Sequence, residues 1–219
     1  MKEYLELLQQ CPLFDRMDAE GLLKLLSCLG AQIVHIPKGG YILRQGEKAH
    51  SFGVMLSGRG KIIRADLQGG HTLIAMIEPT ELFAEAIACA AVESLPFSVM
   101  ACEACTVLMF RHSRIMKGCP KGCTCHSKLI TSLLRLISLK NLFLNQKMEI
   151  VMRRTTREKL MSYLYAQSRH TGSKRFLIPY DRQGLADFLG VDRSAMSAEL
   201  SKMKKEGLID FRKNEFEIL

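Results

Sequence analysis

Hydrophobic residues follow two different spacings in the first half of the chain. In residues 1–30 leucines recur at helical spacing, with a break at Cys11-Pro12 and an end at Gly30, so short helices are predicted there. From residue 31 to about residue 110, short apolar runs alternate with glycine-bearing turns. Many short strands at close spacing are typical of an antiparallel barrel or jelly roll. A β-roll preceded by helices is therefore expected.

A single long helix is predicted next, because residues 127–151 contain no proline or glycine. Its apolar residues keep a seven-residue repeat, which is typical of a coiled-coil dimer. Asn141 falls at a core position, where a polar side chain favours a two-stranded state with a fixed register. Further leucines widen the apolar face, so we expect a second face to pack on the roll. The repeat consists of Ile130, Leu134, Ile137, Asn141, Leu144, Met148 and Val151.

Two short helices joined by a tight turn are predicted for residues 181–208. Gly190 can end the first helix, and Asp192 is a good N-cap for the second. One apolar stripe on each helix leaves small polar and basic side chains exposed at the start of the second helix, which can therefore enter a DNA major groove. The stripes are Leu185, Phe188 and Leu189, then Met196, Leu200 and Met203, and the exposed residues are Arg193, Ser194, Ser197 and Ala198.

The end of the chain predicts a β-hairpin. Apolar residues alternate in residues 208–212 and again in residues 215–218, around a Lys213-Asn214 turn. A helical hairpin alone is common in globular domains. Followed by such a hairpin, or wing, it indicates a winged helix-turn-helix.

Composition and charge agree with a DNA-binding protein. The 219 residues are 47% hydrophobic and 24% charged, as in soluble globular proteins. The formal net charge of +9 favours a polyanionic partner such as double-stranded DNA, because neutralising phosphates releases counterions. Arg153, Arg154 and Arg157 mark a basic hinge between the long helix and the last domain.

The sequence gives no sign of export or of membrane insertion. No apolar run reaches the ~20 residues needed to span a bilayer. The first residues do not have the pattern of a signal peptide. Eight cysteines without an export signal are expected to be free thiols. We therefore expect a cytoplasmic protein with no membrane partner.

The order of roll, long helix and winged helix-turn-helix resembles the Crp–Fnr superfamily of bacterial transcription regulators over nearly the whole chain. Three motifs in the roll half and two in the last domain carry the resemblance. They are Pro12-Leu13-Phe14, Gly39 with Gln45-Gly46-Glu47, Leu56-Ser57-Gly58, Arg182-Gln183 through Gly190, and Arg193 through Leu200 to Gly207-Leu208-Ile209.

The resemblance implies an α+β fold in three parts: N-terminal helices and an effector-sensing double-stranded β-helix (jelly roll) in residues 1–126, a dimerisation helix in residues 127–153, and a winged helix-turn-helix in residues 154–219. It implies a homodimeric regulator on a dyad-symmetric operator with half-sites about one helical turn apart, and RNA polymerase as a further partner. The implied base readers are Arg193, Ser194 and Ser197, and the implied phosphate contacts are Arg182, Gln183 and Lys202.

One departure from the family concerns base reading. Many members carry an arginine where Ala198 stands. With alanine, discrimination must come from fewer groups or from an apolar contact to a thymine methyl.

A second departure concerns the effector. The stretch that resembles the cyclic-nucleotide cassette keeps Glu85, but Ala84 replaces the glycine and Leu95 stands where the arginine is expected. No basic residue lies in residues 79–105, so a buried phosphate would have no cation, which disfavours cyclic AMP. Either another small molecule binds here, or the pocket is closed and the roll is a scaffold. The candidate pocket is Phe83, Ala84, Glu85, Ala86, Leu95, Phe97 and Ser98.

A second candidate sensor is a cysteine-rich loop before the long helix. Cys119, Cys123, Cys125 and His126 lie within eight residues and could bind zinc, an iron–sulfur cluster or haem, or undergo oxidation. The spacing is not a standard zinc pattern, and a surface turn is the alternative. Cys102 and Cys105 are expected to be structural thiols, with Cys105 starting a strand.

Two other function classes make different predictions from the same sequence. A jelly-roll metalloenzyme would use clustered ligands, typically with a His-x-His pair, but the roll histidines are scattered one per segment. A ligand-binding or interaction module that does not bind DNA would show no salt-dependent affinity for a duplex. The histidines in question are His35, His50, His71 and His112.

Overall fold

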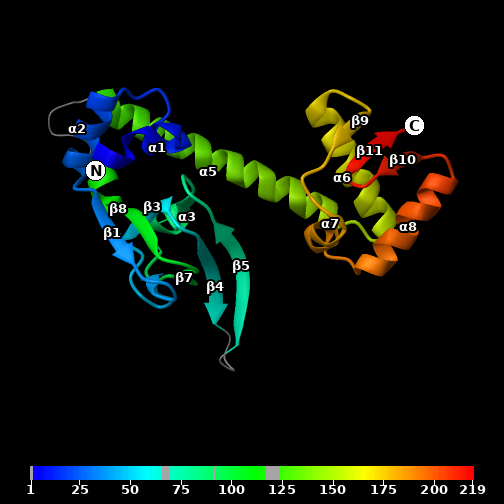
Figure 1. The fold of residues 1–219 in the computed structure, drawn as a ribbon, viewed down its shortest axis with the longest axis horizontal. Helices are drawn as coiled ribbons and strands as arrows, with labels where there is room; N and C mark the ends of the chain where they lie inside the picture. Colours follow the sequence, from blue (N-terminus) through cyan, green and yellow to red (C-terminus); the bar gives the residue numbers. More distant parts are fainter. Residues whose placement is uncertain (1, 66–69, 91, 117–123) are drawn as a thin grey trace. The chain divides into compact units, whose positions relative to one another are not determined.

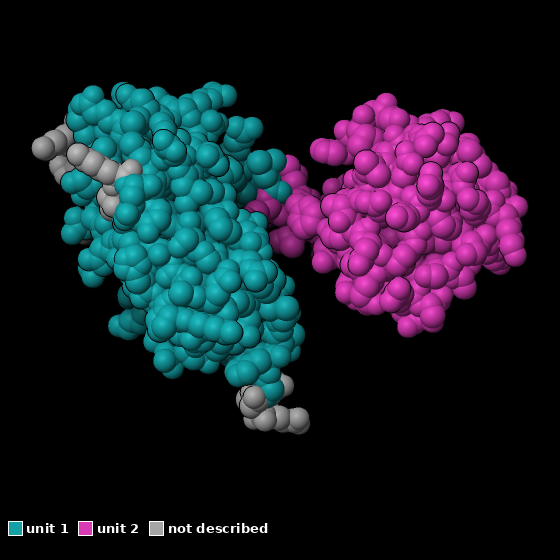
Figure 2. All heavy atoms as spheres, viewed as in Figure 1, with its two compact units in different colours: residues 1–139 teal, residues 140–219 magenta. Residues whose placement is uncertain are grey.

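The computed structural model describes residues 2–65, 70–90, 92–116 and 124–219, which form two compact units (Figure 1, Figure 2). Unit 1 consists of residues 1–139 and unit 2 of residues 140–219. The boundary falls inside helix α5 (Thr124–Val151), whose first part belongs to unit 1 and whose last part belongs to unit 2. The single long helix predicted from the sequence is therefore confirmed as an element.

Unit 1 begins with the short helices that the leucine spacing predicts. Asp18 caps α2 by accepting a hydrogen bond from the Gly21 N–H, and Gly30 ends that helix with a φ of 59°. The helices are η1 (Lys2–Tyr4), α1 (Leu5–Gln10), η2 (Pro12–Phe14) and α2 (Ala19–Leu29).

The rest of unit 1 is a β-roll of two four-stranded antiparallel sheets, which confirms the predicted jelly roll. One sheet has the order β1-β8-β3-β6 and the other has the order β2-β7-β4-β5. The strands are β1 (Gln32–Ile36), β2 (Tyr41–Leu43), β3 (Ser51–Ser57), β4 (Gly60–Ala65), β5 (His71–Ile77), β6 (Leu82–Phe83), β7 (Ser98–Ala101) and β8 (Cys105–Arg111), with short helices α3 (Glu85–Cys89) and α4 (His112–Met116).

One hydrophobic core joins the roll to the helices of unit 1. The rings of Phe52 and Phe110 stack at 5.4 Å between centroids, and Phe14 from η2 lies 6.1 Å from Phe110. Leu129 and Leu133 from α5 are buried in the same core. One face of α5 therefore packs on its own roll, as its widened apolar face predicts.

Unit 2 is a winged helix-turn-helix. Its three-stranded antiparallel sheet has the order β10-β11-β9, and the β10–β11 hairpin is the predicted wing. Its core includes Ile150 from α5 together with residues of every other element. The elements are α6 (Thr156–Thr171), β9 (Arg175–Leu177), α7 (Arg182–Leu189), α8 (Arg193–Lys205), β10 (Ile209–Arg212) and β11 (Glu215–Ile218).

None of the helices in the described residues combines the length and the hydrophobicity that crossing a lipid bilayer requires.

Candidate nucleic-acid interface

Local capping interactions fix the turn between α7 and α8. The Asp181 carboxylate accepts a hydrogen bond from the Gly184 N–H at 2.7 Å, and Asp192 accepts one from the Ala195 N–H at 2.8 Å. Gly190 ends α7 with a φ of 63°, a conformation that side chains disfavour. The helix boundaries predicted from these residue types are confirmed.

Helix α8 has one fully buried face and one exposed face. Its apolar stripe is buried completely in the core of unit 2. The stripe consists of Met196, Leu200 and Met203. The side chains predicted to read bases lie outside this stripe: Arg193 and Ser194 are exposed and Ser197 is half-buried.

The exposed face of α8 extends beyond the residues that the sequence analysis singles out. Ala198 and Lys202 are exposed, and so are Ser201 and Lys205. Residues 194, 198, 201 and 205 recur at helical spacing opposite the buried stripe, so the same periodicity that predicts the stripe also indicates Ser201 and Lys205.

The serine hydroxyls of α8 donate hydrogen bonds within unit 2. Ser194 Oγ donates to Asp192 Oδ1, and this bond lowers the pKa of the Asp192 carboxyl. Ser197 Oγ donates to the Arg193 carbonyl oxygen at 2.9 Å, and Ser201 Oγ donates to the Ser197 carbonyl oxygen at 2.9 Å.

Of the three arginines expected to mark a basic hinge, Arg153 and Arg154 are exposed, whereas Arg157 has carboxylate partners within unit 2. Its guanidinium Nη1 and Nη2 donate to Glu206 at 2.7 and 3.0 Å, and its Nε donates to Glu199 at 2.5 Å. These bonds raise the pKa of Arg157 and lower that of Glu206. Arg157 therefore connects α6 to α8, because hydrogen bonds between two charged groups are stronger than those between neutral groups.

The two residues of α7 expected on DNA phosphates also have partners within unit 2. The Arg182 guanidinium lies over the rings of Phe211 and Phe216, at 4.8 and 5.1 Å from their centroids, and burial lowers its pKa. A guanidinium that stacks through its face keeps its N–H donors at its edge. Gln183 Nε2 donates to Asp187 Oδ1 at 2.8 Å. Their contact with phosphate stays a prediction.

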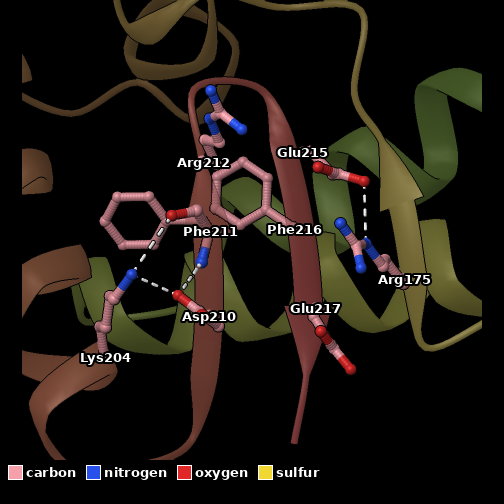
Figure 3. Close-up of a pocket in the computed structure, with 8 residues that line it drawn as sticks. All are labelled: Arg175, Lys204, Asp210, Phe211, Arg212, Glu215, Phe216 and Glu217. Carbon is pink, nitrogen blue, oxygen red and sulfur yellow. Dashed lines mark hydrogen bonds and ion pairs between the residues drawn. The ribbon is translucent and has the colours of Figure 1, made fainter.

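A pocket of about 360 Å³ lies against the wing hairpin (Figure 3). Charges of both signs line it, and two pairs of them form ion pairs. Arg175 Nε lies 2.8 Å from Glu215 Oε1, and Lys204 forms an ion pair with Asp210. Two of the three cations in the lining, Arg175 and Lys204, are therefore paired with carboxylates, and Arg212 is the third.

Most of the positive charge of the chain lies in unit 2. Residues 140–219 contain 16 Lys and Arg against 10 Asp and Glu, which is +6 of the net +9. Among the described residues, no ion pair engages Arg193 or Lys205. The exposed face of α8 therefore combines polar side chains with cations that are available to a polyanion.

Comparisons with known proteins agree with this geometry. Residues 33–119 match the family of cyclic nucleotide-binding domains, and residues 158–219 match the family of Crp-like helix-turn-helix domains. The chain belongs to the Crp–Fnr family of transcription regulators. It therefore combines a DNA-binding helix-turn-helix with an effector-sensing domain, as this family does. A comparison with curated protein sequences gave no match.

Solved structures of other Crp–Fnr-like proteins share the fold. The crystal structure of DNR from Pseudomonas aeruginosa has 24% sequence identity and a TM-score of 0.51, covering 100% of this chain and 95% of that one. The DNR sensor domain alone gives 23% identity and a TM-score of 0.55 over 71% of this chain and 98% of that one. The c-di-GMP-responsive regulator CLP from Xanthomonas campestris gives 16% identity and a TM-score of 0.53, with coverage of 92% and 99%.

In this Crp–Fnr regulator, most residues of the candidate effector pocket are packed into the roll. Phe83, Ala84, Glu85, Leu95 and Ser98 are buried, Phe97 is half-buried and Ala86 is exposed. A Cβ built on Gly53 would collide with the Phe83 ring, so this ring closes directly on β3.

Residues on two sides of the candidate pocket are held in place, one by its backbone conformation and the others by hydrogen bonds. Ala84 takes a φ of 62° as the N-cap of α3, so the backbone keeps a glycine-like conformation although the side chain has changed. On the other side, the Ser98 hydroxyl accepts a hydrogen bond from the Gln45 N–H at 2.9 Å. The Leu95 N–H donates to the Glu47 carbonyl oxygen at 2.8 Å. The Gln45-Gly46-Glu47 turn is therefore tied to the Leu95–Ser98 side of the candidate pocket.

The cysteine-rich loop is described only in part. Cys119 and Cys123 lie outside the described residues. Cys125 is a half-buried free thiol, and His126 is buried with its Nε2 donating to the Ile115 carbonyl oxygen at 2.6 Å. In the described part of the chain, His126 Nδ1 has no hydrogen-bond partner, and no group of three or more His, Cys, Asp or Glu is placed to hold a metal ion. The proposed metal or redox role stays a prediction.

Proposed function

We propose that this protein is a homodimeric one-component transcription regulator that binds a dyad-symmetric DNA operator through the exposed face of α8. The observation that carries the proposal is this face: a capped helix with a fully buried stripe, exposed polar residues at its N-terminus and cations without ion pairs among the described residues. A helix of this kind suits the major groove, where its first residues contact base edges.

The heptad repeat of α5 supports dimerisation. Ile130, Leu134, Leu144 and Met148 are exposed apolar residues of that repeat, and Ile137 and Val151 are half-buried. Asn141 is exposed at its core position and accepts a hydrogen bond from Asn145 at 2.7 Å. An exposed apolar stripe of this length is typical of a helix that meets a second copy of itself.

The N-terminal unit is proposed to receive a small-molecule or redox signal other than cyclic AMP. The supporting observation is chemical: residues 79–105 contain no Lys, Arg or His, so the described cassette around Glu85 offers no cation for a cyclic phosphate. A signal of this kind would change the orientation of the two α8 helices of the dimer, as a two-state rigid-body switch.

Selection of duplexes from a randomised DNA pool tests the proposed function. The wild-type protein is expected to enrich a palindromic consensus whose half-sites lie about 10–11 base pairs apart, centre to centre. Enrichment of a non-palindromic sequence would contradict the dimeric mode of binding. Failure to enrich any sequence would contradict operator binding altogether.

A further inference from the structure

The hydroxyl hydrogens of the α8 serines already have acceptors inside the protein. A serine hydroxyl carries one hydrogen and two lone pairs. The hydrogen of Ser194 is directed at the Asp192 carboxylate, which has no hydrogen to give in return when it is ionised. Asp192 is ionised at neutral pH, because its hydrogen bonds with Ser194 and the Ala195 N–H hold its pKa below the ordinary value of 3.8. Ser194 is therefore the donor of this pair.

The same assignment follows for the next serines along the helix. Ser197 lies 2.9 Å from the Arg193 carbonyl oxygen and Ser201 lies 2.9 Å from the Ser197 carbonyl oxygen. A carbonyl oxygen only accepts hydrogen bonds, so both hydroxyls must donate. What each of these serines can offer outside the helix is its lone pairs.

We propose that Ser194 and Ser197 read DNA as hydrogen-bond acceptors, and that each selects a base with an amino group on its major-groove edge, adenine or cytosine, on the strand that it faces. This inference rests on the proposed operator binding and names the bases that it prefers. Adenine N6 and cytosine N4 are the amino donors of the major groove, whereas guanine N7 and O6 and thymine O4 are acceptors. Facing an acceptor edge, a hydroxyl would have to break its bond within the protein before it could donate.

Arg193 has the opposite chemistry. Its guanidinium has donors only, and within the described residues no ion pair occupies it, so it fits the acceptor edge of guanine. The exposed methyl of Ala198 adds a surface for a thymine methyl. At the start of α8, Arg193 is therefore suited to hydrogen-bond acceptors on base edges, and Ser194 and Ser197 are suited to hydrogen-bond donors on base edges.

Base analogues in the selected operator test this assignment. 2-Aminopurine replaces adenine and moves its amino group to the minor groove. N4-methylcytosine replaces cytosine and has a methyl group in place of the amino hydrogen that faces the major groove. 7-Deazaguanine replaces guanine and removes the N7 acceptor. Dissociation constants are measured for each duplex with the wild type, Ser194→Ala, Ser197→Ala and Arg193→Ala. Thr171→Ala is the matched control, because it removes a hydroxyl that donates to the carbonyl oxygen four residues earlier in α6, outside the proposed interface.

We expect an amino-group analogue at one position of each half-site to weaken wild-type binding about 3- to 10-fold, the worth of one hydrogen bond. The same analogue should not change the dissociation constant of the Ser→Ala variant whose serine faces that base. 7-Deazaguanine should weaken binding of every variant except Arg193→Ala. Coupling of either serine to 7-deazaguanine, or of neither serine to an amino-group analogue, would overturn the inference while operator binding stands. A selection that enriches no duplex would overturn both proposals.

Discussion

Arg157 and Arg193, both in unit 2, are expected to have different roles because their neighbouring residues differ. The guanidinium of Arg157 donates hydrogen bonds to Glu199 and Glu206, whereas Arg193 has no ion pair among the described residues. We expect Arg193→Ala to weaken operator binding by about 1–3 kcal/mol and to relax specificity at one base pair per half-site. Titration of the selected and a scrambled duplex measures both effects. Equal losses on the two duplexes would make Arg193 a phosphate contact instead.

Arg157 is expected to stabilise unit 2 in a pH-dependent way. Its side chain holds the pKa of Glu206 below the ordinary value of 4.5. A carboxyl whose pKa is lower in the folded state contributes stability above pH 4.5, and that stability is lost as the pH falls through the folded-state pKa. The melting temperature of Arg157→Gln should therefore lie below that of the wild type at pH 7, and the difference should shrink below pH 4.5. A difference independent of pH would contradict this account of the Arg157–Glu206 pair.

The sequence could not predict the partners of Arg157. Its carboxylates lie 42 and 49 positions further along the chain, on and just after α8, so no local pattern joins them. Nor could the sequence predict the stacking of Arg182 on Phe211 and Phe216, because it depends on how the wing folds back. The capping residues Asp181 and Asp192 were predictable, because each bonds to a backbone N–H three residues later.

At the scale of elements, α5 offers a matched pair of exposed leucines. Leu144 is 61% exposed and belongs to the heptad repeat, whereas Leu142 is 64% exposed and lies on another face of the helix. A leucine buried in an interface is worth about 1.5–3 kcal/mol and occurs twice in a dimer. Leu144→Glu should therefore raise the dimer dissociation constant by roughly 100-fold or more.

Sedimentation equilibrium distinguishes the two leucines. Leu142→Glu is the control and should leave the dissociation constant of the dimer unchanged. Equal weakening by both substitutions would show that the repeat is not the interface. A wild-type chain that sediments as a monomer at all concentrations would contradict dimerisation through α5.

Long or periodic elements were predictable, and very short ones were not. The alternation around Lys213 and Asn214 predicts the wing, and the lack of glycine and proline predicts α5. The strands β6 and β9 have two and three residues, too few for an alternating pattern to appear. They form because β3 and β11 offer them unpaired edges, which is a property of the folded sheet.

At the scale of the whole molecule, charge and architecture point to the same partner. Unit 2 carries +6 of the net +9 in 80 of the 219 residues, so the excess of cations lies with the helix-turn-helix. The family could be inferred from the order of roll, long helix and wing, because that order is a property of the whole chain. The bases that α8 prefers could not be inferred in this way, since they depend on where individual hydroxyl hydrogens are directed.

The salt dependence of operator binding tests the central claim, that a pair of α8 helices binds duplex DNA, most directly. If Arg182 and Lys202 of both subunits contact phosphates, the logarithm of the association constant should fall linearly with the logarithm of the KCl concentration, with a slope of roughly −3 to −4 or steeper. At fixed salt the selected duplex should bind about 10³-fold or more tightly than a scrambled one. Affinity for the duplex that does not change with salt, or no preference between the two duplexes, would contradict the claim.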